Sequence, residues 1–166
     1  MTRDGRGSIA EKVRLLRWML KFWIDVVRLQ KKRCEGSREK LFEHTVDLIF
    51  YIDSLGRMRD IAHRTTNLHR IREISEREIR WKRLAKAKAA LQTFDQKWPK
   101  LLAVRNQLEH LDAGLDTRFG KVVKADKLGH VETLISVADI HPDVEALYQG
   151  LKESLDDLAL DDWLPP

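Results

Sequence analysis

A short run of the sequence brings four kinds of reactive side chain together. Residues 101–112 hold the guanidinium of Arg105, the amide of Asn106, the carboxylate of Glu109 and the imidazole of His110. A guanidinium is a permanent donor fork for phosphate, and an imidazole titrates near neutral pH. Together these groups could bind a phosphodiester and move a proton on it. A solvated helix face with an incidental histidine explains the same residues without any chemistry.

The run is expected to be helical. Pro99 suits a first turn, Leu101, Leu108 and Leu111 supply an apolar side, and Gly114 suits a C-terminal stop.

Helical geometry decides which of the reactive side chains can meet. Asn106 and His110 are four residues apart and nearly superposed, as are Arg105 and Glu109. Arg105 and His110 point roughly 140° apart, at about 100° per residue. Both can still lean toward one groove on the Asn106 side.

The pattern Arg105-Asn106-x-x-x-His110 resembles the signature of the HEPN superfamily, and Glu109 and Asp112 resemble those of one subgroup. The resemblance implies an all-α bundle that dimerises and, in many members, a metal-independent ribonuclease of toxin–antitoxin or other defence systems. It implies that His110 is the general base or acid and that Arg105 holds the scissile phosphate. Asn106 would orient His110 or bind the phosphate, and Glu109 would fix the arginine fork.

The implied reaction is attack of the ribose 2′-hydroxyl on its own phosphodiester, which yields a 2′,3′-cyclic phosphate and a 5′-hydroxyl. No metal and no cofactor is expected. One helix supplies only one such set of residues, so the resemblance implies a cleft shared by two subunits. The expected partners are RNA, a second copy of the chain and, as a candidate, an antitoxin protein.

Two other interpretations stay open. Several HEPN members lack nuclease activity and act as RNA-binding or regulatory subunits. Leu111 and the Ala113-Gly114 pair, where a bulkier and more polar continuation is expected, depart from the closest subgroup. A helical-bundle interaction module that carries the motif by chance is the third interpretation.

Basic residues are densest before the motif, on a helix expected from Leu68 to Trp98. Between Glu78 and Lys88 that helix has basic residues and no acidic one. The set expected to bind the RNA backbone electrostatically is Arg77, Arg80, Lys82, Arg83, Lys86 and Lys88. A helix solubilised by its own ion pairs is the alternative.

Composition fits one helical domain of about five helices over residues 1–166, with residues 1–7 disordered. The chain has 166 residues, a formal net charge of +5 and one cysteine. The single cysteine excludes an internal disulfide and suits a reducing cytosol. The apolar run from Leu15 to Val27 is too short and too charged to span a bilayer. We therefore expect a cytoplasmic protein with no membrane partner.

The first helix is expected from Ser8 to about Cys34, with an apolar surface so broad that it fits either a subunit interface or a central position. A second helix is expected to start at Ser37 and to continue to Ala62, with Gly56 as a weak point.

Other candidate sites are expected to be structural. His44 and Asp47 are three residues apart, but the sequence has no Glu-x-x-His, His-x-x-x-His or Cys-x-x-Cys. Cys34 is expected to be an inert thiol at a helix end. His63 and His69 are expected to be solvated in a polar connection.

The region after the motif departs from the helical pattern. Residues 119–141 are rich in β-branched residues and glycine, which indicates an irregular or β-hairpin excursion. A last helix is expected to open at His141. The acidic residues near its C-terminus are disfavoured by the helix dipole, so they are expected to face a basic surface.

Overall fold

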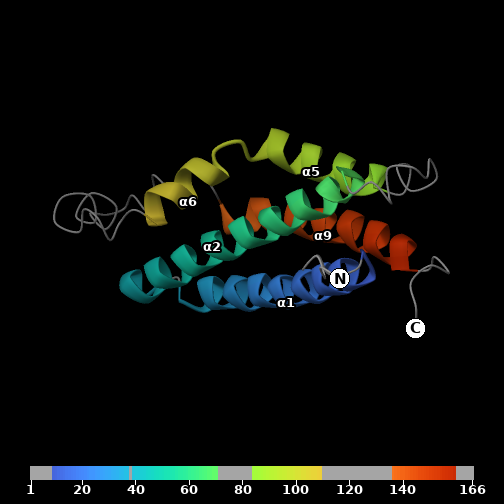
Figure 1. The fold of residues 1–166 in the computed structure, drawn as a ribbon. Coiled ribbons are helices and arrows are strands. Elements are labelled where there is room, and N and C mark those ends of the chain that lie inside the picture. The colour runs from blue at the N-terminus through green and yellow to red at the C-terminus, as the bar shows by residue number, and fades with distance from the viewer. Residues whose placement is uncertain (1–8, 38, 71–83, 110–135, 160–166) are drawn as a thin grey trace.

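The chain forms an all-α bundle, as the sequence predicted (Figure 1). The computed structural model describes residues 9–37, 39–70, 84–109 and 136–159. Those residues form five α-helices and one 3₁₀ helix. In chain order the elements are α1 (Ile9–Gly36), α2 (Leu41–Thr66), η1 (Asn67–Arg70), α5 (Ala85–Lys97), α6 (Leu101–Glu109) and α9 (Val137–Ala159).

Helices α2 and α9 lie in the middle of the bundle. Helix α1 packs on one side of them, and α5 and α6 pack on the other side (Figure 1). Apolar side chains from every α-helix meet in one core, among them Ile24 of α1, Ile52 of α2, Leu91 of α5, Leu101 of α6 and Leu151 of α9. The core thus fixes where each helix presents its polar residues.

Two close approaches of helices depend on glycine. At Gly150 of α9 an added Cβ would lie 2.6 Å from Cβ of Ala90 on α5. At Gly56 of α2 an added Cβ would lie within 3.0 Å of three side-chain atoms of Arg105 on α6. The sequence analysis took Gly56 for a weak point, whereas α2 continues unbroken through it. Position 56 requires glycine because a side chain there would collide with Arg105 of α6.

The boundary between α1 and α2 differs from the expectation. Ser37 does not start α2, because its hydroxyl donates a hydrogen bond to the carbonyl oxygen of Arg33 (2.8 Å) and so closes α1. Lys40 stands at the N-cap of α2 without a side-chain cap. Helix α2 also runs four residues past Ala62, to Thr66. His63 therefore lies inside a helix rather than in a polar connection.

Later boundaries differ too. The single helix expected over 68–98 is described as η1 and α5, and residues 71–83 between them lie outside the described residues. Helix α9 begins at Val137 instead of His141, so residues 137–141 are helical and not part of a hairpin. The rest of the expected excursion lies outside the described residues, as do residues 1–7.

Candidate functional site

Helix α6, which carries the first residues of the motif, is held to α2 by Arg105. The Arg105 side chain is only 12% exposed. Its Nη1 donates to Oδ2 of Asp60 (3.3 Å), and its Nε lies 3.6 Å from Oδ1 of Asp53. Both carboxylates belong to α2, and they lie one turn on either side of Gly56. The guanidinium is thus a clamp between two helices rather than an open surface cation.

The rest of the motif is described only in part. Asn106 and Glu109 belong to α6, and their side chains lie outside the described residues, as does all of His110. Of the expected catalytic set, Arg105 is the residue whose side chain the structure describes. The structure adds Asp53 and Asp60, which the sequence analysis did not single out. Their spacing of seven residues on one helix is the signal that could have identified them.

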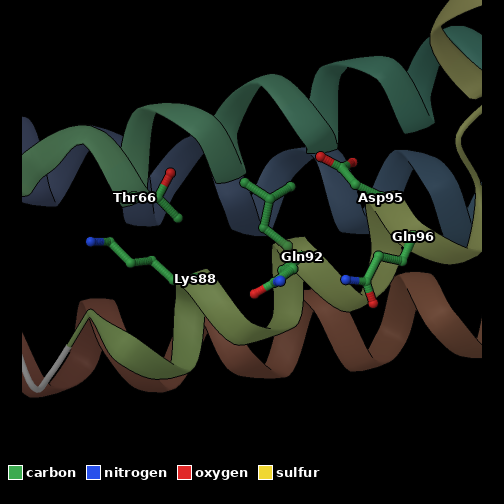
Figure 2. A pocket seen from close by; sticks show the side chains of 6 residues that line it. Thr66, Lys88, Gln92, Asp95 and Gln96 are labelled. Carbon is green, nitrogen blue, oxygen red and sulfur yellow. The ribbon is translucent and has the colours of Figure 1, made fainter.

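Of the residues expected to bind RNA, the structure describes some and not others. Arg77, Arg80, Lys82 and Arg83 lie outside the described residues. Lys86 forms an ion pair with Glu153 of α9 (Nζ to Oε2, 2.8 Å), and this contact raises the pKa of Lys86. Lys88 instead reaches along a shallow groove between α5 and α2 (Figure 2).

That groove encloses a volume of about 450 Å³. Figure 2 shows Lys88, Gln92 and Gln96 on successive turns of α5, with Thr66 of α2 opposite Lys88. Burial lowers the pKa of Lys88. Asp95, which also lines the groove, is held by α2, because Arg59 donates to both of its oxygens (2.7 and 2.9 Å). The groove is therefore lined by the Lys88 ammonium, the amides of Gln92 and Gln96, and an aspartate that is paired with Arg59.

A second polar cluster lies at the edge of the core, where it joins the buried Tyr51 to the partly exposed Glu145 and Arg28, and it was missed by the sequence analysis. The Tyr51 hydroxyl lies 3.3 Å from Nδ1 of His141, and Nε2 of His141 lies 3.5 Å from Oε1 of Glu145. Arg28 of α1 then donates two hydrogen bonds to Glu145 (2.8 and 2.7 Å), and its guanidinium lies 5.3 Å from the ring centre of Tyr148. The four-residue spacing of His141 and Glu145 could have revealed this cluster.

Burial sets the electrostatics of this core cluster. It raises the pKa of Tyr51 and lowers the pKa of His141, while the hydrogen bonds from Arg28 lower the pKa of Glu145. Every polar member of the cluster is paired with another: Tyr51 with His141, and Glu145 with His141 and Arg28. The cluster ties α1, α2 and α9 together and is structural.

His44 and Cys34, which were expected to be structural, both lie at the junction of α1 and α2. His44 Nδ1 lies 3.0 Å from the carbonyl oxygen of Cys34 and 3.5 Å from the Ser37 hydroxyl, so it joins the end of α1 to the start of α2. Cys34 is 2% exposed, and burial raises the pKa of its thiol to about 12. Asp156 also meets a basic group, since Arg17 of α1 lies 2.9 Å from it.

Within the part of the chain that the structure describes, no group of three histidine, cysteine, aspartate or glutamate residues could hold a metal ion. None of the described helices has the length and apolar character that crossing a membrane requires. No family model, no curated protein and no solved structure matches the chain.

Proposed function

We propose that the protein is a metal-independent endoribonuclease of the HEPN type, with its site at the C-terminal end of α6. The observation that supports this proposal is the Arg105 clamp. Asp53, Asp60 and the close contact of Arg105 with Gly56 fix the helix that carries Asn106 and Glu109 and leads directly to His110. Chemistry that depends on a phosphate contact and a proton transfer needs such a rigid support.

In this proposal His110 moves the proton and Asn106 orients it or binds the phosphate. Arg105 positions α6 and also supplies charge to the scissile phosphate. Its contacts with the two carboxylates, at 3.3 and 3.6 Å, are longer than the roughly 2.7–2.9 Å of a strong charge-assisted hydrogen bond. In this proposal a phosphate oxygen takes the place of Asp60 as the acceptor of the hydrogen bond from Nη1 of Arg105. Glu109 remains a proposed partner of the same guanidinium.

RNA is the proposed substrate, and cleavage is proposed to occur in the cytoplasm. A second copy of the chain is proposed to complete the cleft, and an antitoxin protein is a candidate regulator. Because α2 lies between α6 and α1 (Figure 1), a copy that completes the cleft would bind beside α6 rather than on α1. Arg77, Arg80, Lys82, Arg83, Lys86 and Lys88 are proposed to hold the RNA backbone.

The alternative is an RNA-binding or regulatory protein, or an interaction module, without nuclease activity. The engagement of Arg105 by two carboxylates and of Lys86 by Glu153 favours it, because each contact neutralises a charge that the nuclease would use.

The test is RNA cleavage by the full chain with and without EDTA, with the product ends analysed. We expect cleavage that EDTA does not change, with 2′,3′-cyclic phosphate ends. His110→Ala should abolish it and leave the denaturation midpoint unchanged. His63→Ala, which removes a histidine outside the proposed site, is the matched control and should cleave normally. A wild-type chain that binds RNA in a salt-dependent way but cuts none would establish the alternative.

A further inference from the structure

Helix α1 presents a row of large apolar side chains to solvent. Leu15, Trp18, Phe22 and Leu29 are 55%, 64%, 46% and 50% exposed, and Val26 beside them is half-buried. The rings of Trp18 and Phe22 stack on each other, with centroids 5.6 Å apart. We call these five residues the α1 stripe. No element among the described residues covers it, since α2 and α9 pack on the other sides of α1.

Apolar side chains at solvent in such a continuous row mark an interaction surface. The opposite face of the same helix is fully used by the core, where Val13, Leu20, Ile24 and Val27 are 0–2% exposed. The stripe is therefore a second apolar face, and the core that the described residues form does not account for it.

The stripe is symmetric about Phe22. Trp18 and Val26 stand four residues before and after it, and Leu15 and Leu29 stand seven residues before and after it. Steps of four and seven keep all five side chains on one face of an α-helix. A two-fold axis through Phe22, perpendicular to the helix, would place each residue of one copy opposite its counterpart in an antiparallel copy. A closed two-fold contact requires this kind of self-complementary surface.

The two ends of the stripe carry opposite charges at equal distances from Phe22. Glu11 and Arg33 stand eleven residues before and after Phe22, and both are exposed. In an antiparallel pair Glu11 of each copy would lie opposite Arg33 of the second copy. Near the axis, Asp25 would lie beside Lys21 of the second copy. Arg14 and Lys32 of opposite copies would approach with like charge, but next to Glu11, which offsets the repulsion.

We propose that a second copy of the chain covers the α1 stripe, with the two α1 helices antiparallel and Phe22 at the two-fold axis. The occupant is a second copy because both the apolar pattern and the end charges complement themselves. This contact is separate from the proposed nuclease cleft, since α2 separates α1 from α6. It leaves the end of α6 open in both copies.

The first test is the mass of the full chain in solution by analytical ultracentrifugation at micromolar concentration. We expect at least twice the chain mass of 19.4 kDa, because the proposed cleft beside α6 uses a different contact between copies. Phe22→Arg should raise the dissociation constant of the pair at least about 100-fold, because it places two like charges at the axis of a buried hydrophobic contact. A wild-type monomer would overturn the proposal.

A charge exchange tests the antiparallel arrangement. Glu11→Arg or Arg33→Glu alone should weaken the pair, whereas the chain that carries both changes should pair like the wild type. The double variant is the matched control, because it has the same composition and net charge as the original. Weakening that the second change fails to repair would contradict the proposed register.

Cysteine cross-linking tests the position of the axis. Phe22→Cys should form a disulfide-linked dimer by itself, and Leu15→Cys should link to Leu29→Cys in a mixture. Leu29→Cys alone should not link, because two copies of residue 29 would be roughly 21 Å apart along the helices at 1.5 Å per residue. Cys34 is buried, so the unmodified chain gives the background. Self-linking of Leu29→Cys would indicate a parallel pair and refute the geometry. All these readouts are independent of RNA cleavage.

Discussion

Gly56 of α2 and Arg105 of α6 lie in direct contact, with the arginine side chain occupying the space where any other residue at position 56 would place its Cβ. An added Cβ would lie 2.3 Å from Cδ and 2.6 Å from Nε of Arg105. The two carboxylates that hold the guanidinium, Asp53 and Asp60, flank the same glycine. The position of α6 therefore depends on two features: Gly56 leaves space for Arg105, and Asp53 and Asp60 hold the guanidinium of Arg105.

This contact makes the effect of Gly56→Ala depend on Arg105. In the wild-type chain we expect the substitution to lower the free energy of unfolding by about 1–2 kcal/mol, because the clamped side chain must move. In an Arg105→Ala chain the same substitution should instead raise it by up to about 1 kcal/mol, since alanine is the better helix former. Urea denaturation of the four proteins measures this coupling. Equal effects in both backgrounds would show that the two residues do not interact.

A second glycine sets the distance between α5 and α9. An added Cβ at Gly150 would lie 2.6 Å from Cβ of Ala90 and 3.3 Å from the carbonyl oxygen of Lys86. Neither atom can rotate away, so Gly150→Ala should cost about 1–3 kcal/mol of stability. Ala90→Gly in the same chain should restore part of it.

Gly36→Ala is the control for that experiment, because nothing lies within 4 Å of the added Cβ there. Its effect on the unfolding free energy should stay within about 0.5 kcal/mol. A loss at position 36 as large as that at position 150 would contradict the steric explanation.

The helices could be predicted because apolar periodicity is a local signal. The first helix was expected from Ser8 to Cys34 and spans Ile9–Gly36, and the start of α6 was located within two residues of Pro99. The two uses of glycine could not be predicted. Gly56 carries the same local signal whether it breaks a helix or admits a neighbour, and only the tertiary contact with Arg105 separates the two.

The site was harder to anticipate than the fold, for the same reason. A motif names residues of one helix, whereas Arg105 is held by carboxylates of another, 45 and 52 residues earlier in the chain. Likewise, Tyr51, His141 and Arg28 meet from three helices, and the sequence analysis placed His141 at the edge of a hairpin. Helical spacing reveals neighbours within one element and not those across elements.

The thiol of Cys34 should be unreactive in the folded chain. It is 2% exposed, and burial together with the nearby charge of Asp47 raises its pKa to about 12. At pH 8 hardly any thiolate is present, so a thiol reagent should label the native protein at least about 100-fold more slowly than the urea-unfolded protein. Spectrophotometric titration measures both rates. Rapid labelling of the native chain would show that this end of α1 opens readily.

Acid should weaken the core cluster that joins α1, α2 and α9. Burial lowers the pKa of His141 below its ordinary value of 6.5. The positive charges of Lys31 and Arg28 also lower this pKa, whereas the negative charge of Glu145 raises it. The unfolded chain therefore takes up a proton on His141 at a pH where the folded chain does not. Stability is thus expected to be full above pH 6.5 and to fall as the pH drops below it, by at most about 1.4 kcal/mol per pH unit for this one proton.

The measurement is urea denaturation between pH 7.5 and pH 5, for the wild type and for His141→Gln. Glu145 does not titrate in that range, because the hydrogen bonds from Arg28 lower its pKa from 4.5. The stability that Glu145 contributes is lost only when the pH falls below 4.5. The variant should be less stable at pH 7.5, because Tyr51 loses its partner, and should depend less steeply on pH. If its slope equals that of the wild type, the acid sensitivity belongs to another group, and the buried imidazole does not link the folding of the bundle to pH.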